Sequence, residues 1–321
     1  MNILIMSSGE DTGGVGIGIK RAFDKVDPSW SVRFVRRADN FIHYPPDIHW
    51  AAGDTRTERV VKRLFEEADV VHVMEKWGTI EDMPGFEDKP KVIHHHGTHF
   101  RQNPNASLVA ARERNAIQLA ATIDLYLTAP DDLELLPAPY DLDWLAGIRE
   151  DYLNYNGPIK IAHAPTKRVG KSTGPFANAY AKLAENNNVS VDIIEGASWM
   201  ECIGRKAVID VYFDQVLTGY GNNAIECWAM GIPVIAGADY EQSVARGHPV
   251  PKGTLEFMEK RWGELPFYNA NEDTIYDALV AMMHPSTRLE YGERGNRHVH
   301  KYHSQQAVVG QLKDVYMRAA R

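Results

Sequence analysis

The sequence predicts an α/β protein built from two doubly wound, Rossmann-like domains. Short apolar runs recur along the chain, and each is followed by a turn signal and a helical pattern, which is typical of βαβ units and a parallel sheet. The series stops near residue 140 and restarts at Ile159. The length of 321 residues also favours two domains, because domains of about 150 residues are common.

The first domain is expected to span residues 1–140 and to alternate strands with helices. Its predicted strands are Asn2–Met6, Ser31–Arg36, Ala68–Met74, Lys91–His95 and Asp124–Thr128. Its predicted helices are Val15–Lys25, Thr57–Glu67 and Leu108–Ala121.

Residues Pro137–Pro158 carry three prolines and two glycines without a long strand pattern, which indicates the crossing into a second domain of residues 141–302. Its predicted strands are Ile159–His163, Val189–Ile194, Val208–Phe213 and Pro233–Ile235. Its main predicted helices are Pro175–Glu185 and Asn223–Met230. The last segment, His303–Arg321, is predicted to be a long amphipathic helix.

Composition excludes several classes of protein. A hydrophobic fraction of 44% is ordinary for a globular protein, and the net charge of −8 argues against a protein that coats nucleic acid. Two cysteines cannot build a disulfide framework, so a reducing compartment is favoured. The first residues do not match a signal peptide and no run is long enough to cross a bilayer. We therefore expect a cytoplasmic protein, or one that works at a membrane surface.

The most specific stretch is YGNNAIECWAMGIPVIA, which covers residues 220–236. Gly221, Asn222 and Asn223 lead into a helix, and the unpaired N–H groups and positive dipole end at its start suit a diphosphate. Glu226 would repel phosphate there unless it binds a hydroxyl, such as that of a ribose. A plain helix that ends at a glycine is the structural alternative.

A second stretch, HAPTKRVGKSTGP at residues 163–175, follows a predicted strand. Arg168 offers a bidentate fork and Lys171 a point charge, so the loop is a candidate phosphate clamp. It is not a P-loop, because Pro165 stands where the first glycine of that motif is required. The alternative is a solvated basic loop.

Glycines also crowd the loop SSGEDTGGVGIG at residues 7–18. Gly13 and Gly14 would let the backbone approach a ligand closely, or they form a tight strand-to-helix turn. The spacing does not fit a dinucleotide fingerprint, since Ile19 and Arg21 occupy positions where glycine is needed. Hydride chemistry therefore loses support.

Four histidines gather at the end of a predicted strand, in the run His94-His95-His96-Gly97-Thr98-His99. A zinc site is disfavoured because neighbouring strand residues point to opposite faces, and no cysteine or carboxylate cluster accompanies them. We therefore expect no metal here. His96 is a candidate for stabilising charge or binding a sugar, with a purely structural histidine as the alternative.

The stretch from Gly221 to Ile235 resembles the donor-site signature of the family 4 (group 1) glycosyltransferases, which have the GT-B fold of two Rossmann-like domains facing across a cleft. That signature has two glutamates separated by seven residues, then Ala-Met-Ala-x-Gly-x-Pro-Val. The resemblance implies that Glu226 is the second glutamate and holds the nucleotide ribose. Thr218 replaces the first glutamate, which contacts the sugar, and Tyr220 lies beside it.

Further roles follow from the resemblance rather than from the spacing. Arg168 and Lys171 match the residues that grip the donor diphosphate, and Gly13-Gly14 matches paired glycines that face the donor phosphate. Glu195, Gly196 and Ala197 fall in the loop that meets the nucleotide base. His96 matches a histidine near the transferred sugar, and Asp214 is a candidate to supply the carboxylate that is missing at Thr218, so both are catalytic candidates. The helix of residues 303–321 is expected to cross back to the first domain.

The function implied is transfer of a sugar from a nucleotide-diphosphate sugar, with a UDP- or GDP-sugar favoured as donor, with retained anomeric configuration and without a cofactor or obligatory metal. The acceptor stays open among a glycan, a lipid-linked sugar, a protein and, less favoured because of the acidic composition, a modified DNA base. A different reaction on a nucleotide sugar, such as epimerisation, and non-catalytic nucleotide-sugar binding are the alternatives. No sequence feature indicates the oligomeric state.

Overall fold

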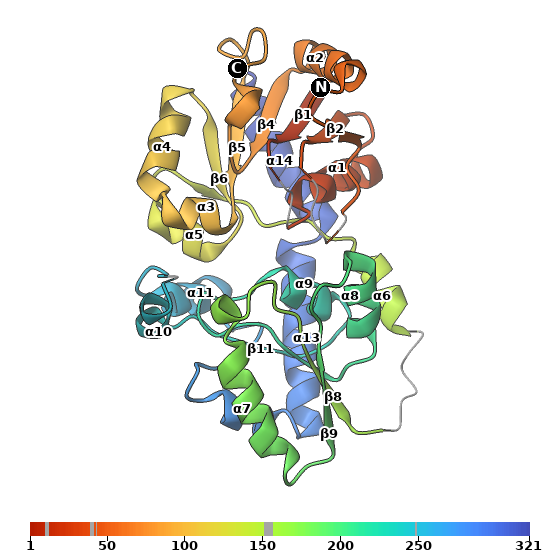
Figure 1. The fold of residues 1–321 in the computed structure, drawn as a ribbon, viewed down its shortest axis with the longest axis vertical. Coiled ribbons are helices and arrows are strands. Elements are labelled where there is room, and N and C mark those ends of the chain that lie inside the picture. The colour runs from red at the N-terminus through yellow and green to blue at the C-terminus, as the bar shows by residue number, and fades with distance from the viewer. Residues whose placement is uncertain (10–12, 39–41, 43, 151–156, 248) are drawn as a thin grey trace. The chain divides into compact units, whose positions relative to one another are not determined.

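The computed structural model describes residues 1–9, 13–38, 42, 44–150, 157–247 and 249–321. Contacts divide the chain into two compact units, each an α/β structure built on a parallel sheet (Figure 1). Unit 1 comprises Met1–Tyr140 and His303–Arg321, and unit 2 comprises Asp141–Tyr302. The predicted fold class, two Rossmann-like α/β halves, is confirmed.

Unit 1 contains a seven-stranded sheet in the order β3-β2-β1-β4-β5-β6-β7, and every neighbouring pair is parallel. Its strands are β1 (Asn2–Ser7), β2 (Ser31–Arg36), β3 (Ile48–His49), β4 (Val70–Met74), β5 (Lys91–His95), β6 (Ile117–Ala120) and β7 (Glu134–Leu135). Its helices are α1 (Val15–Val26), α2 (Thr55–Glu67), α3 (Gly97–Gln102), α4 (Pro104–Glu113), α5 (Ile123–Thr128) and α14 (Gln305–Ala319), and residues Gly78–Ile80 form a 3₁₀ turn.

Unit 2 contains a five-stranded parallel sheet in the order β12-β11-β10-β8-β9. Its strands are β8 (Ile159–His163), β9 (Val189–Ile193), β10 (Val211–Phe213), β11 (Val234–Ala236) and β12 (Tyr268–Asn269). Its helices are α6 (Leu142–Glu150), α7 (Thr173–Ala184), α8 (Trp199–Ala207), α9 (Asn222–Ala229), α10 (Tyr240–Ala245), α11 (Thr254–Trp262), α12 (Ile275–Ala281) and α13 (Pro285–Tyr302), and Val169–Lys171 forms a 3₁₀ turn.

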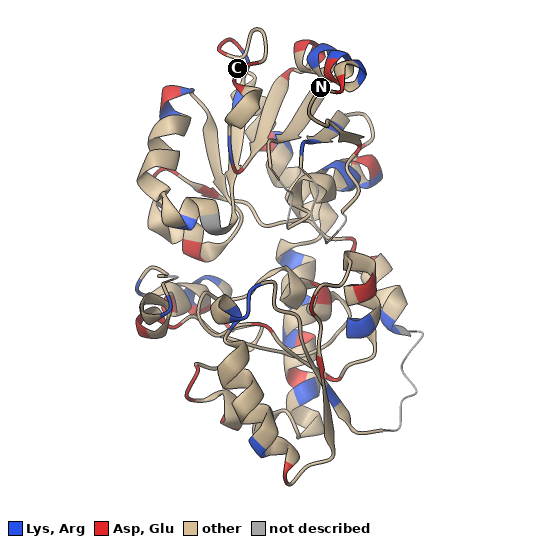
Figure 2. Cartoon of the chain, in the orientation of Figure 1, with Lys and Arg blue, Asp and Glu red and all other residues tan. Residues whose placement is uncertain are grey.

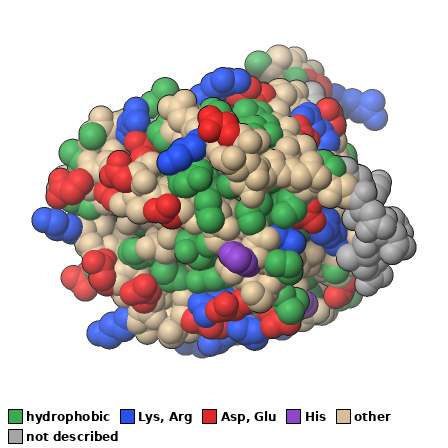
Figure 3. All heavy atoms as spheres, turned by 90° about the horizontal axis from the view of Figure 1, so that it is seen from below, with side chains coloured by type: hydrophobic (Ala, Val, Ile, Leu, Met, Phe, Trp, Pro, Cys, Tyr) green, Lys and Arg blue, Asp and Glu red, His purple; other side chains and the backbone are tan. Residues whose placement is uncertain are grey.

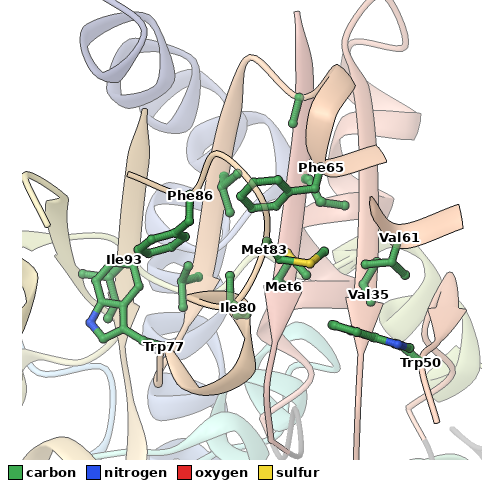
Figure 4. Packing of buried hydrophobic residues seen from close by; sticks show 14 of the residues in the cluster. Met6, Val35, Trp50, Val61, Phe65, Trp77, Ile80, Met83, Phe86 and Ile93 are labelled. Carbon is green, nitrogen blue, oxygen red and sulfur yellow. The ribbon is translucent and has the colours of Figure 1, made fainter. Parts of the chain in front are cut away.

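A large part of the core of unit 1 lies between the sheet, helix α2 and the segment that connects β4 to β5 (Figure 4). Trp77 and Phe86 meet edge to face, with ring centroids 5.9 Å apart, beside Ile93 of β5. Phe65 of α2 lies in the same cluster and is 1% exposed. Every residue of β4 and β5 is buried, including polar ones such as His72 and Lys91, which explains why neither strand shows an alternating pattern in the sequence.

The C-terminal helix α14 belongs to unit 1, where it packs against α1 and β5. The fully buried ring of Tyr316 lies 6.0 Å from Phe23, and its hydroxyl lies 2.7 Å from His72 Nδ1. At the entry to α14, the Tyr140 N–H donates to the His303 carbonyl over 2.8 Å. The outgoing and returning segments of the chain are therefore tied together at one point of unit 1.

Two predicted elements near residue 120 are wrong. The segment predicted as a helix over Leu108–Ala121 holds the end of α4 and the strand β6, and the predicted strand Asp124–Thr128 belongs to helix α5. Asp124 is buried because it pairs with Arg101 over 2.7 Å and accepts from the Thr122 hydroxyl. This ion pair overrides the short apolar run that predicted a strand.

Smaller differences concern the crossing and one strand. The stretch Pro137–Pro158, predicted to be a linker, contains helix α6, and its residues 151–156 lie outside the described part of the chain. The strand predicted from Val208 begins at Val211, after the end of helix α8. Helix α8 itself was not predicted.

Charged side chains of both signs are interspersed over the ribbons of both units (Figure 2). The face in Figure 3 likewise mixes charges with hydrophobic side chains. Among the described residues, exposed large hydrophobic side chains include Val169, Met200 and Leu289. No helix in the described ranges is long and apolar enough to cross a bilayer.

Close packing of α13 on α9 generates a stability prediction. A Cβ added at Gly295 of α13 would lie 1.9 Å from the Trp228 ring, which is fully buried and has no room to move. Gly295→Ala is therefore expected to lower the free energy of unfolding by about 1–3 kcal/mol, measured by urea denaturation. Gly204→Ala, on an exposed face of α8 with nothing within 4 Å, is the control and should raise it by about 0.5–1 kcal/mol. Equal effects of the two changes would contradict this packing.

Candidate functional site

Both sheets have one place where successive connections leave in opposite directions. In unit 2 the chain runs from β8 outward to β9 and then back to β10 on the other side of β8. In unit 1 the same reversal lies between β1 and β4. Ligands of open α/β sheets bind at the carboxyl ends of the strands at such reversals. The loops that follow β8 and β10 are therefore the candidate ligand site of unit 2.

Asp214 follows β10 and joins these two loops. Its side chain is 1% exposed, and Oδ2 accepts from the Gly221 N–H over 2.5 Å. Its other oxygen accepts from Lys171 Nζ over 3.1 Å. A Cβ added at Gly221 would lie 3.3 Å from Lys171 Nζ, so the ammonium lies close against the backbone of Gly221. Lys171, Asp214 and Gly221, three predicted site residues, therefore converge at the start of α9.

The Lys171 loop has an unusual backbone. Ser172, which precedes α7, has φ of 51°, a conformation that favours glycine, and its buried Oγ has no hydrogen-bond partner. Lys171 itself ends the 3₁₀ turn and its side chain is 18% exposed. The strained turn at Ser172 places the ammonium over Asp214 instead of continuing the helix.

Beneath this loop His163, the last residue of β8, is fully buried. Its Nδ1–H donates to the Phe213 carbonyl over 2.9 Å, and Nε2 therefore accepts from the Thr173 hydroxyl over 2.8 Å. Burial lowers the pKa of His163 to about 4, so the ring is neutral at pH 7. This histidine links the ends of β8 and β10 to the start of α7. Sequence reasoning missed its role.

Arg168 and Glu195, predicted for the diphosphate and the base, face each other. Arg168 Nε lies 2.8 Å from Glu195 Oε1 and a terminal nitrogen lies 2.5 Å from Oε2, which is a bidentate pair. Both side chains are exposed, and hydrogen bonding to the guanidinium lowers the pKa of Glu195. Gly196, with φ of 64°, and Ala197 continue this loop into α8.

Glu226 lies inside α9 and is 2% exposed. Oε1 accepts from the indole N–H of Trp199 over 2.8 Å, and Oε2 pairs with the fully buried ammonium of Lys206. Asn223 is also engaged, because its side chain accepts from Lys206 over 2.8 Å and donates to the Ala164 carbonyl over 3.2 Å. Asn222 is the first residue of α9.

The two residues predicted to contact the sugar differ in their surroundings. Thr218 is partly exposed in the loop between β10 and α9. The Tyr220 hydroxyl lies 3.2 Å from His298 Nε2, and its ring packs against Trp228 and Trp262 with centroids 4.9 and 5.9 Å away. Tyr220 therefore packs toward α13, apart from the Lys171 and Glu226 contacts. Its role in sugar binding stays a prediction.

In unit 1, Gly13 and Gly14 lie between β1 and α1 and directly precede α1. Gly14 has φ of 64° and precedes α1, and a Cβ there would lie 2.7 Å from the Tyr44 ring. The glycine is thus required by both the turn and its neighbour. Gly14 thus forms the entry into α1, and the predicted contact of both glycines with a phosphate is untested.

His96 follows β5 and precedes α3. Its Nε2 is enclosed without a hydrogen-bond partner, and burial, with His95 and Arg101 nearby, lowers its pKa to about 4. His94 lies on one side, its ring edge-on at 6.1 Å, whereas His95 pairs with Gln118 over 3.0 Å. Within the described ranges no group of three or more His, Cys, Asp or Glu side chains is arranged to hold a metal.

Glu75, at the end of β4, is another residue that the sequence did not indicate. It has φ of 65°, and the Lys76 N–H donates to the Met74 carbonyl across it over 2.7 Å, which is the hydrogen bond of a γ-turn. A Cβ at Gly97 would lie 3.1 Å from Glu75 Oε1, so the carboxylate lies over the start of α3. Positive φ is typical of glycine, so the glutamate at position 75 gives no indication in the sequence that the backbone turns there.

Comparison with solved structures shows the GT-B glycosyltransferase fold. HepE from Anabaena, in complex with UDP and glucose, is similar over 99% of both chains with a TM-score of 0.67 and 12% identity. An alpha-glucosyltransferase in complex with UDP and a 13-mer DNA containing an HMU base is similar over 98% of this chain and 99% of that one, with a TM-score of 0.64 and 11% identity.

WaaG, a glycosyltransferase involved in lipopolysaccharide biosynthesis, is similar over 98% of this chain and 99% of that chain, with a TM-score of 0.58 and 13% identity. No family model and no curated protein sequence matches the chain. At these identities the likeness is one of fold, and it agrees with the fold that the sequence resemblance implied.

The neutral, buried state of His163 predicts a pH dependence of stability. The pKa is about 4 in the folded chain and about 6.5 in the unfolded one, so between these values only the unfolded state binds the proton. The stability that this residue contributes is present above about pH 6.5 and is lost as the pH falls to about 4. We expect His163→Gln, compared with the parent by urea denaturation at pH 7 and 4.5, to lose less stability over that interval. Identical losses in the two proteins would refute this.

Proposed function

We propose that the chain is a glycosyltransferase that moves a sugar from a nucleotide-diphosphate sugar to an acceptor hydroxyl. The observation that carries the proposal is the convergence of Lys171, Asp214 and Gly221 where α9 starts, at the reversal of the unit 2 sheet, in a chain with the GT-B fold. A cation held against a helix N-terminus is suited to bind a diphosphate.

Lys171 is assigned to the diphosphate, because its ammonium is fixed by Asp214 yet partly exposed. Arg168 is assigned to the same group and would exchange Glu195 for phosphate oxygens. The start of α9, at Gly221 and Asn222, adds the positive end of the helix dipole. Asp214 then acts by positioning Lys171 and Gly221, while a catalytic contact remains its further proposed role.

Glu226 is assigned to the ribose, and the loop of Glu195, Gly196 and Ala197 to the base. A UDP-sugar is favoured as donor because HepE and the alpha-glucosyltransferase are described in complex with UDP. Thr218 is the remaining candidate for the sugar in this loop, since Tyr220 packs toward α13. The sugar itself is left open by this assignment.

The proposed chemistry is electrostatic. As the bond between the sugar and the diphosphate breaks, negative charge grows on the leaving oxygen, and Lys171, Arg168 and the α9 dipole stabilise it. We propose that the anomeric configuration is retained, on the basis of the sequence resemblance. This assignment gives charge stabilisation to protein groups and requires no cofactor.

Unit 1 is assigned to the acceptor, with Gly13, Gly14 and His96 at the carboxyl ends of β1 and β5. His96 is the catalytic candidate there, as a neutral ring whose Nε2 has no partner. Glycans and lipid-linked sugars are favoured over a modified DNA base because the net charge of −8 disfavours a nucleic-acid acceptor. Action in the cytoplasm or at a membrane surface is part of the same proposal.

The assignment of Lys171 predicts a specific loss. Lys171→Ala should weaken UDP binding about 10- to 100-fold, because a hydrogen bond to a charged group is removed, and should lower donor turnover at least as much. Isothermal titration with UDP measures the first effect. Lys167→Ala, an exposed lysine in the same loop, is the matched control and should change binding by less than about threefold. Unchanged binding in a folded Lys171→Ala protein would contradict the assignment.

The pair between Arg168 and Glu195 predicts a gain. Glu195→Gln removes the carboxylate that competes for Arg168, so UDP should bind about two- to fivefold more tightly at low salt, with a smaller effect at about 0.5 M salt. Glu201→Gln on α8 removes the same charge from an exposed residue that contacts Arg205 instead. If both variants tighten binding equally, the effect is one of general charge and the competition does not occur.

A further inference from the structure

Lys206 is a fully buried lysine that the assignments above leave without a role. It lies near the end of α8, and its ammonium pairs with Glu226 of α9. Burial alone would lower the pKa of Lys206, but the carboxylate of Glu226 outweighs burial and raises it. The pair is therefore ionic although Lys206 is fully buried and only 2% of the Glu226 side chain is exposed.

The surrounding hydrogen bonds connect this pair to the loop after β8 and to the first turns of α8 and α9. Lys206 Nζ also donates to Asn223 Oδ1 over 2.8 Å, and Asn223 reaches the Ala164 carbonyl after β8. On the other side Trp199, the first residue of α8, donates to Glu226. Helix α8 thus holds both oxygens of the Glu226 carboxylate, one from each of its ends.

Stability does not explain this arrangement. Removing two charges from water costs free energy that their mutual attraction repays only in part, and well-packed hydrophobic residues often do as well or better. Trp199 also supplies more than packing, because its ring contacts Trp144 in a tilted arrangement with centroids 5.4 Å apart while its N–H donates to Glu226. The groups are arranged to fix a carboxylate in place.

We infer that Lys206 and Trp199 are positioning residues that hold the Glu226 carboxylate for the two ribose hydroxyls of the donor nucleotide. The inference rests on the proposed function. A carboxylate offers about four lone-pair directions, so two donors from α8 leave others for hydroxyls. Lys206 also offsets the charge of Glu226, which would otherwise repel the diphosphate bound at the start of the same helix. Because the Glu226 carboxylate is already fixed in place, less conformational entropy is lost when it binds the ribose hydroxyls.

The test compares two ligands that differ only in the ribose hydroxyls, UDP and 2′,3′-dideoxyuridine diphosphate, by isothermal titration. The parent protein should bind UDP about 10- to 100-fold more tightly, since charge-assisted hydrogen bonds are absent without the hydroxyls. Lys206→Met should reduce this ratio to below about threefold. We expect a similarly low ratio for Glu226→Gln, which removes the carboxylate itself. Trp199→Phe keeps a ring beside Trp144 but lacks the N–H, and should reduce the ratio about threefold or more.

Lys182→Met is the matched control, because this exposed lysine of α7 lies over the ring of Tyr276 on α12, and its replacement should leave the ratio unchanged. The ratio compares the affinities of one protein for UDP and for its dideoxy analogue. A change that weakens the binding of both ligands equally therefore leaves the ratio unchanged. Trp199→Phe decides the outcome if Lys206→Met does not fold. If the chain binds GDP in preference to UDP, the corresponding guanosine pair of ligands is used.

Three results separate this inference from the proposed function. Parental ratios in both Lys206→Met and Trp199→Phe would overturn the positioning role. Equal binding of UDP and its dideoxy analogue by the parent would remove Glu226 from the ribose and overturn the inference, while a loss of UDP binding in Lys171→Ala would still support the donor site. Absence of binding to either nucleoside diphosphate would overturn both.

Discussion

The buried carboxylate of Asp214 is the group on which the donor edge of unit 2 depends. One oxygen accepts from the Gly221 N–H, which fixes where α9 begins, and the other holds the ammonium of Lys171. The two loops come from β8 and β10, the pair of strands between which the sheet reverses direction. Without this acceptor, a cation and a helix N-terminus would repel each other at the same place.

The same edge shows how a protein manages several buried charges. Lys171 forms an ion pair with Asp214, and Lys206 forms one with Glu226. His163 carries no charge at pH 7 because burial lowers its pKa. Arg168 differs, since its partner Glu195 is exposed and exchangeable. We expect the buried pairs to shape the site before ligand arrives, and the exposed pair to open when it does.

The sequence predicted the fold because both halves repeat strand, turn and helix with little interruption. The short runs of buried residues at β4 and β5 and the motif that leads into α9 are signals that local pattern carries. The error at Asp124–Thr128 arose because a buried pair with Arg101 decides the structure there, and a short apolar run does not report a partner 23 residues away. Helix α8 was missed because it begins at Trp199, only three residues after Gly196, and this stretch was interpreted as a loop.

For the site, the sequence identified the charged residues but not what holds them. Arg168 and Lys171 stand out as a basic loop after a predicted strand, the role of Glu226 follows from the family resemblance, and Lys171 lies beside Gly221. Lys206 and Trp199 could not be recognised, because their importance comes from contacts with Glu226 over 20 and 27 residues of chain. Tyr220 shows the reverse, a motif residue whose side chain packs elsewhere.

Hydrogen–deuterium exchange with and without UDP tests the central claim most directly, because it reports where a nucleoside diphosphate acts on the whole chain without any knowledge of the acceptor. We predict slower exchange on UDP addition in residues 164–173, 195–206 and 221–226, the segments that follow β8, β9 and β10. Protection confined to other segments of unit 2 or to unit 1, or none at saturating UDP and GDP, would contradict that claim.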